Sequence, residues 1–184
     1  MKKKTSSHKS ILLSLIAGLS ILGGQGTVLA APQAGPSKAP AETIRAALLS
    51  DKWDKTFPVD KRVNHKKVTF HNRFLIDMVG DLYFPANYSP AKKYAAIIVG
   101  HPFGGVKEQT SGLHARKLAE IGYVTLAFDA SYYGESGGYP RRMESPEVRV
   151  DDFSAAVDFL TNHPAVEADK IGVIGICGGG CYSV

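Results

Sequence analysis

The residues best suited to chemistry lie near the end of the chain, where a cysteine stands between glycines in the pattern G-x-C-x-G, residues 175–179. The apolar run before it, residues 171–176, is typical of a buried strand. A sharp turn from a strand into a helix holds its central residue in a strained backbone conformation, and glycine on both sides avoids clashes. Such a turn lifts the side chain of Cys177 clear of the sheet. The pattern therefore predicts a nucleophile elbow.

A thiol at this turn is suited to attack on a carbonyl carbon. Amide dipoles at a helix N-terminus favour the thiolate, which is the reactive form of cysteine. The backbone N–H of Gly178 would then point at the developing oxyanion. Cys177 is the candidate nucleophile, and the alternative is a small buried residue in a glycine-rich turn. Cys181, one turn further on, is expected to be a packing residue.

A nucleotide-binding turn is a rival interpretation of the same glycines. The G-x-G-x-x-G pattern fails because Cys177 takes its third position, and no acidic residue follows at the required distance. The phosphate-binding pattern G-x-x-x-x-G-K-[ST] is absent from the sequence. A metal site is not indicated, since the histidines are scattered and the two cysteines have no nearby partners. We therefore expect no cofactor and no metal.

The elements that must position this turn follow from the apolar pattern. Strands are predicted at 67–73 and 76–84 as an antiparallel hairpin, then at 94–100, 123–128 and 171–176, with helices at about 109–121 and 146–162. In the second helix the apolar residues at helical spacing are Val150, Phe153, Ala156, Val157 and Leu160. A hairpin followed by alternating buried strands and helices predicts an α/β fold with a mostly parallel sheet.

Three segments together resemble the α/β-hydrolase superfamily, and most closely its dienelactone-hydrolase-like branch. They are HPFGGVKEQ at 101–109, FDASYYGESGG at 128–138 and IGVIGICGGG at 171–180. The resemblance runs from about Lys67 to Val184. It implies a sheet in the strand order 1-2-4-3-5-6-7-8, cut after the fifth strand in this chain. It also implies a hydrolase that acts on a carboxylic ester, lactone or thioester of a small acyl substrate.

The resemblance indicates where a second oxyanion donor belongs. In this superfamily the loop after the third strand provides it, and here that loop is residues 101–105. Pro102 has no N–H to donate, so the backbone N–H of Phe103 is the expected donor, with that of Gly104 behind it. His101 is expected to brace this loop rather than to titrate in catalysis.

Four further side chains stand near the expected site. Asp129, Tyr132 and Tyr133 follow the C-terminal end of a strand, where the ligand sites of α/β sheets lie. The two tyrosines are candidate substrate-binding residues, and a packed loop is the equal alternative. Glu108 could approach the thiol, since enzymes of this kind sometimes hold a carboxylate there. A solvated glutamate at a helix start is the preferred interpretation.

A nucleophile of this kind needs a base, and the base needs an orienting acid. In α/β-hydrolases the chain order is nucleophile, acid, histidine. Here no histidine follows His163, and His101 and His114 precede the nucleophile. The triad acid and histidine are therefore not present in this chain. Two alternatives stay open, the N-terminal part of a longer hydrolase and a truncated, non-catalytic remnant.

The first thirty residues are expected to be an export signal. Four lysines and no acidic residue precede the apolar run 11–22, which is too short for a membrane span. Val28 and Ala30 are small residues at positions that a signal peptidase reads. This predicts cleavage after Ala30 and a periplasmic or secreted protein, with an uncleaved N-terminal anchor as the alternative.

The remainder of the chain is expected to divide at about residue 67. Residues 31–66 would be a leader with a short helix at 41–50, and residues 67–184 the N-terminal part of the hydrolase domain. The whole chain has 22 basic residues against 17 acidic ones, and four lysines belong to residues 1–30. The 18 remaining basic residues nearly balance the 17 acidic ones, so the charge gives no case for nucleic acid or an anionic membrane as partner.

Overall fold

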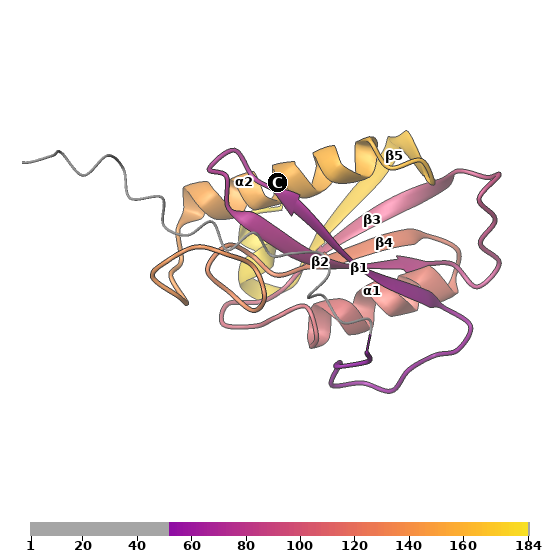
Figure 1. Ribbon diagram of the computed structural model, residues 1–184, viewed down its shortest axis with the longest axis horizontal. Coiled ribbons are helices and arrows are strands. Elements are labelled where there is room, and N and C mark those ends of the chain that lie inside the picture. The colour runs from indigo at the N-terminus through magenta and orange to yellow at the C-terminus, as the bar shows by residue number, and fades with distance from the viewer. Residues whose placement is uncertain (1–51, 184) are drawn as a thin grey trace, which may run out of the picture. The chain divides into compact units, whose positions relative to one another are not determined.

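The computed structural model describes residues 52–183 (Figure 1). The expected export signal and the expected helix at 41–50 lie outside the described residues. None of the helices within 52–183 is long and apolar enough to cross a bilayer.

The described residues form one five-stranded sheet. Its strands are β1 (Asn64–His71), β2 (Asp77–Phe84), β3 (Tyr94–Gly100), β4 (Val124–Phe128) and β5 (Val166–Gly175). Their order across the sheet is β1-β2-β4-β3-β5, the order expected for the first five strands. β2 runs antiparallel to β1 and β4, whereas β3 runs parallel to β4 and β5. The predicted fold class is therefore confirmed.

Two helices cover the two faces of this sheet, α1 (Thr110–Glu120) and α2 (Pro146–Thr161). Figure 1 shows α2 on one side of the strands and α1 on the other. Alternate side chains of the buried strands serve the two sides: Ile98 belongs to the apolar cluster under α2, and Val99 to the one under α1. Both faces of the sheet are thus covered, which explains why β3 is a continuous apolar run and why every residue of β4 is buried.

The contact between α2 and the sheet depends on Gly100 at the end of β3. A Cβ at this position would lie 2.2 Å from the ring of Phe153. Phe153 packs edge-on against Phe128 of β4, with ring centroids 5.2 Å apart. Helix α2 therefore packs closely against the C-terminal end of β3. The candidate site lies at this end of the strands.

The buried face of α2 differs from the one predicted. Val150 is 43% exposed, whereas Arg149 and Asp152 are buried beside Phe153. Arg149, Phe153, Ala156 and Leu160 follow one another at helical spacing, so they lie on one face. The prediction placed Val150 on the buried face because it counted only apolar residues.

The fifth strand begins earlier than predicted. Val166 already pairs with Tyr94, and the pairing is irregular before it resumes at Ala96 and Ile171. Glu167, Asp169 and Lys170 are part of this strand although these polar residues break the apolar run. β5 is the edge strand of the described sheet, so it is not fully buried, and Ile174 is 37% exposed.

Part of the expected leader packs against the sheet. Phe57 and Val63 are buried, and Trp53 donates a hydrogen bond from its indole Nε1 to the carbonyl of Phe57. Strand β1 begins at Asn64, inside the segment that was expected to be leader. Residues 52–66 therefore contribute to the core and to the sheet.

Candidate active site

The elbow at Cys177 joins β5 to a short 3-10 helix, η2 (Cys177–Cys181). Ile176 is extended, with φ −100° and ψ 124°, and Cys177 takes φ +52°. A positive φ is rare for a residue with a side chain and marks a strained position. The N–H of Gly179 donates to the carbonyl of Ile176 at 2.9 Å and closes the turn. The predicted strand-to-helix turn, with a strained cysteine at its centre, is thus present.

The two glycines that flank Cys177 are required by close contacts. A Cβ on Gly175 would lie 2.3 Å from the carbonyl oxygen of Gly179. A Cβ on Gly179 would lie 2.7 Å from the carbonyl oxygen of His101, in the loop after β3. The G-x-C-x-G spacing therefore reflects both the tight turn and the approach of the elbow to the neighbouring loop.

Both cysteines are free thiols exposed at the surface of the described residues. The exposure of Cys177 leaves its sulfur accessible. Cys181 was expected to pack in the interior, and this was wrong. The 3-10 turn, which has three residues per turn instead of 3.6, replaces the α-helix on which that expectation was based.

The expected oxyanion loop lies against the elbow. A Cβ on Gly178 would lie 2.5 Å from the ring of Phe103, so the two residues are in direct contact. The ring of Phe103 also meets the ring of Tyr182 edge-on, with centroids 6.0 Å apart. Gly104 takes φ +68°, and the N–H of Gly105 donates to the carbonyl of Pro102 at 3.0 Å. The structure thus brings Phe103 and Gly178 together beside Cys177.

His101 is a buried residue that braces this loop, as expected. Its Nδ1–H donates to the carbonyl of Pro102 at 2.8 Å, and its Nε2 accepts from the N–H of Ala130 at 3.0 Å. Burial and then the charge of Arg149 lower the pKa of His101 below its ordinary value. The imidazole is therefore neutral at physiological pH, and neither nitrogen is available to act as a base.

Tyr132 and Tyr133 line a cavity of about 650 Å³ beside the oxyanion loop. The lining residues are Gly104, Val106, Tyr132, Tyr133, Gly134, Arg141 and Arg142. The cavity thus lies between the loop after β3 and the loop after β4, at the C-terminal ends of parallel strands. Burial and then Glu144 raise the pKa of Tyr133, which keeps its hydroxyl protonated.

Asp129 and Glu108 meet a buried lysine instead of the thiol. The ammonium of Lys107 lies 2.8 Å from Asp129 Oδ2 and 2.6 Å from Glu135 Oε2, and it also pairs with Glu108. Lys107 and Asp129 have fully buried side chains. The expectation of a solvated Glu108 was therefore wrong, because only 16% of its side chain is exposed.

The electrostatics of this ion cluster keep Lys107 charged. Burial opposes the charge, but Asp129 and Glu108 outweigh it and raise the pKa of Lys107 above its ordinary value. Burial and the nearby charge of Asp129 raise the pKa of Glu108. The cluster ties the loop after β3, which carries Lys107, to the loop after β4, which carries Glu135.

The same ion cluster reaches the N-terminal segment and β1. Lys67 binds Asp54 and Glu135, each at 2.8 Å. Asp54, Glu108 and Glu135 bring one oxygen each within 4.8 Å of the others, as metal ligands would. The ammonium groups of Lys67 and Lys107 already neutralise these carboxylates, so an ion-pair network accounts for the arrangement.

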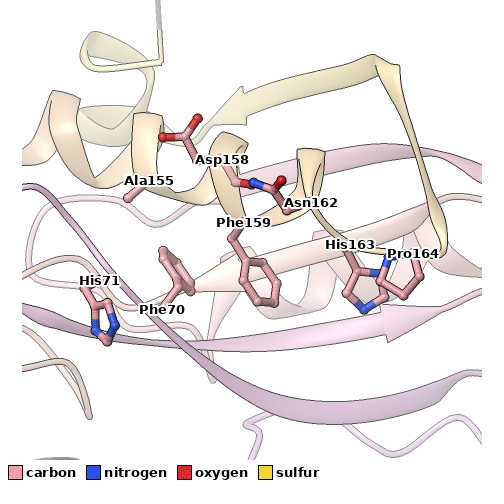
Figure 2. A pocket seen from close by; sticks show the side chains of 8 residues that line it. All are labelled: Phe70, His71, Ala155, Asp158, Phe159, Asn162, His163 and Pro164. Atoms are coloured by element: carbon pink, nitrogen blue, oxygen red, sulfur yellow. The ribbon is translucent and has the colours of Figure 1, made fainter.

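A second cavity lies apart from the elbow, between β1 and α2 (Figure 2). Its volume is about 330 Å³, and the rings of Phe70 and Phe159 stack there with centroids 5.2 Å apart. Figure 2 shows His71 at one end of this cavity and His163 with Pro164 at the other. None of the candidate catalytic residues lines it.

The sequence reasoning missed Lys107 and Arg149. Both are polar residues inside apolar or glycine-rich surroundings, and a charged residue is normally expected at the surface. For Arg149 a signal was present, since it stands four residues before Phe153 on the buried face of α2. For Lys107 we find no comparable signal in the sequence.

Comparison with known proteins agrees with this geometry. The family model described as "Dienelactone hydrolase family" matches residues 82–184, which is more than half of the chain. The chain belongs to this family. It is 52% identical over 149 residues to an uncharacterised protein of Pseudomonas aeruginosa, which covers 81% of this chain and 40% of that one. The crystal structure of that protein aligns with a TM-score of 0.70, over 73% of this chain and 42% of that one.

Two further relatives are a bacterial protein without an assigned function and a fungal thiohydrolase. The Escherichia coli protein YcjY, also uncharacterised, is 48% identical over 121 residues, which are 65% of this chain and 40% of that protein. The thiohydrolase aneE of Aspergillus aculeatus is 34% identical over 89 residues, which are 48% of this chain and 28% of that protein. The chain thus spans 40% of the length of each of these two bacterial proteins.

Proposed function

We propose that the protein is a hydrolase of the α/β type in which Cys177 attacks the carbonyl carbon of an ester, lactone or thioester. The observation that carries the proposal is that Cys177 is exposed and has a strained backbone. It lies between Gly175 and Gly179, where the neighbouring backbone leaves no room for a Cβ. Membership of the dienelactone hydrolase family supports the reaction class. The name of the thiohydrolase aneE favours a thioester among the three substrate types.

The proposed reaction has two halves. The base takes the thiol proton of Cys177, the thiolate Sγ forms a bond to the carbonyl carbon, and the π pair of the carbonyl moves to its oxygen. The backbone N–H groups of Gly178 and Phe103 stabilise this oxyanion. Collapse expels the alcohol or thiol with a proton from the base, and leaves an acyl group on Cys177. Water then attacks the acyl group, gives its proton to the base, and releases the acid and the thiolate.

The base in this cycle would be a histidine from outside these 184 residues, oriented by a carboxylate. His101 is unsuited to the role because both of its nitrogens already form hydrogen bonds. His114 lies on α1, where its Nδ1 donates to the carbonyl of Thr110. Tyr132 and Tyr133 would line the acyl subsite, since they border the cavity beside the oxyanion loop.

We also propose that the protein is exported and that cleavage follows Ala30. The support is the lysine-rich start, the short apolar run 11–22 and the small residues before Ala31. The proposed substrate would then be met in the periplasm or outside the cell.

The two cysteines provide a matched test of the proposal. The protein is expressed from its entire gene. Hydrolysis of short acyl thioesters and esters is then measured for the wild type, Cys177→Ala and Cys181→Ala. We expect Cys177→Ala to lose at least about a thousandfold in kcat, because the covalent route is removed. Cys181→Ala, which also removes an exposed thiol, should keep its activity. Full activity in Cys177→Ala would refute the proposal.

A further inference from the structure

Arg149 is a buried arginine whose contacts converge on the candidate site. It projects from the first half of α2, and its residue is only 3% exposed. Its Nη2 donates to the carbonyl of His101 at 3.3 Å, and its Nη1 donates to Nε2 of the same histidine at 3.2 Å. One guanidinium thus holds both the backbone and the side chain of the residue that begins the oxyanion loop.

The same guanidinium also lies against the other two loops of the site. Its carbon is 5.8 Å from the ring centroid of Tyr133, in the loop after β4, and 5.6 Å from that of Tyr182, just after the elbow. Tyr182 in turn packs edge-on against Phe103. Arg149 therefore contacts a residue of each of the three loops that follow β3, β4 and β5.

Burial, and after it the charge of Arg149, disfavour a proton on the imidazole of His101. The charged and titratable groups that act on His101 are Arg149 from α2, Asp129 from the end of β4, and Glu144 from the loop before α2. The two carboxylates favour a proton on His101, whereas the guanidinium disfavours it. A neutral Nε2 is needed to accept the N–H of Ala130 at the start of the loop after β4.

We propose that Arg149 is a positioning residue that holds the oxyanion loop, the loop after β4 and the elbow in fixed positions relative to one another. Its N–H donation to Nε2 of His101 also favours the imidazole form in which that nitrogen carries no proton. The inference rests on the proposed function, because the fixed arrangement of these loops would serve the reaction at Cys177. Arg149 does not itself line the cavity, although Tyr133 does, and none of its hydrogen bonds or ring contacts within residues 52–183 involves Cys177. It acts through His101, Tyr133 and Tyr182.

Removal of Arg149 should therefore affect the chemistry and the protonation of His101 together. In Arg149→Leu the oxyanion loop loses both of its hydrogen bonds to α2, and His101 can take a second proton. The protonated imidazole can no longer accept from Ala130, so the loop after β4 is released. Arg149→Lys keeps the charge but cannot reach both acceptors of His101. Compared with Arg149→Leu, it should therefore lower the pKa of His101 again but recover less of the lost kcat.

Arg116 on α1 provides a control of the same kind. It is buried on the other face of the sheet, where its Nη1 donates to the carbonyl of Pro58 at 2.9 Å. Its guanidinium lies 5.4 Å from the ring of Phe57, the same type of contact that Arg149 makes with its tyrosines. Arg116→Leu thus tests what loss of a buried arginine does to stability alone.

The experiment uses the protein as its gene encodes it, with kinetics on a short acyl thioester and an NMR titration of His101 assigned by His101→Gln. We expect kcat of Arg149→Leu to fall about tenfold to a hundredfold, with KM changed less than about threefold. The pKa of His101 should be higher in Arg149→Leu than in the wild type, in Arg149→Lys and in Arg116→Leu, because the guanidinium that disfavours its proton is gone.

Two outcomes overturn the inference. One is a His101 whose pKa is no higher in Arg149→Leu than in Arg116→Leu, and the other is a kcat of Arg149→Leu equal to that of Arg116→Leu. The Cys177→Ala variant separates this failure from failure of the proposed function. If Cys177→Ala is inactive while Arg149→Leu resembles Arg116→Leu, the nucleophile stands and the positioning role is wrong. The NMR titration needs no turnover, so it decides the role of Arg149 for His101 even in an inactive protein.

Discussion

At the scale of single residues, the elbow shows how far a short motif determines geometry. Cys177 has φ +52°, a conformation that costs about 1–3 kcal/mol for most residues with a side chain. The flanking glycines make room for it, because the carbonyls of Gly179 and His101 occupy the space where side chains would stand. The strain is thus held in place by packing on both sides of the thiol.

The glycines around the elbow allow a direct test of this packing. Gly179→Ala would place a Cβ 2.7 Å from the carbonyl of His101, which is backbone and cannot move away freely. We expect a loss of about 1–3 kcal/mol in the free energy of unfolding together with lost activity. In the control, Gly172→Ala, the Cβ meets nothing within 4 Å. Equal stability of the two variants in urea denaturation would contradict the account.

Asp152 gives a prediction about pH. Burial raises its pKa to about 6, although Ser131 and Asn72 donate hydrogen bonds to it. Because the native pKa lies above the unfolded one, its contribution to stability is present below about pH 4 and is lost as the pH rises through 6. The stability of the wild type relative to Asp152→Asn should therefore fall by about 2 kcal/mol between about pH 4.5 and 7.5.

Denaturation at several pH values measures this difference. Asp158→Asn, at an exposed position of the same helix, is the control for the loss of a carboxylate from α2. A difference between wild type and Asp152→Asn that grows with pH would have the wrong sign and would refute the explanation.

At this scale the sequence predicted the turn at Cys177, but not the burial of the polar side chains near it. The G-x-C-x-G spacing indicates both the turn and the need for glycine, since each is a local property of a few residues. The burial of Arg149 and Asp152 depends on which face of α2 meets the sheet. Polar residues on that face contribute nothing to an apolar pattern, so the pattern did not reveal them.

At the scale of elements, buried ion pairs join the loop after β3 to the loop after β4. Lys107 in the first loop binds Asp129 at the end of β4 and Glu135 in the second. A pair of buried opposite charges is costly to break from one side, because the remaining charge has no solvent and no partner. These loops border the cavity of Tyr132 and Tyr133, so the ion pairs support the cavity wall.

Lys107→Met tests this link between the loops. The substitution keeps a side chain of similar length but leaves Asp129 buried without its ammonium partner. We expect a loss of about 3–5 kcal/mol in the free energy of unfolding. Lys117→Met removes an exposed lysine that pairs with Glu120 on the same helix, and should cost less than about 1 kcal/mol. A loss for Lys107→Met no larger than this would contradict the account.

Prediction of the elements was accurate where one apolar run fills one buried strand. Residues 94–100 were predicted as a strand, and β3 has these bounds. β5 begins at Val166, before the predicted start at Ile171, because Val166 pairs with Tyr94 and the mostly polar residues 167–170 continue the strand. Pairing between distant strands is a tertiary property, and a single run of sequence does not contain it.

At the scale of the whole molecule, the described residues are the first part of an α/β-hydrolase sheet in which β5 is an edge. β5 exposes Ile174 there, and an unprotected apolar edge is prone to pair with other chains. Expressed as these 184 residues alone, the protein should self-associate, and Ile174→Lys should reduce this. Light scattering of the two proteins measures it. Equal, monomeric behaviour of both would contradict the prediction.

The measurement that tests the central claim most directly is trapping of the acyl-enzyme. The protein, prepared as its gene encodes it, is mixed with a short acyl thioester and quenched in acid, and its mass and peptides are determined. We predict a mass increase equal to one acyl group in place of one hydrogen, located on the peptide that contains Cys177 and absent from Cys177→Ala. An acyl group on another residue, with hydrolysis undiminished in Cys177→Ala, would contradict the account.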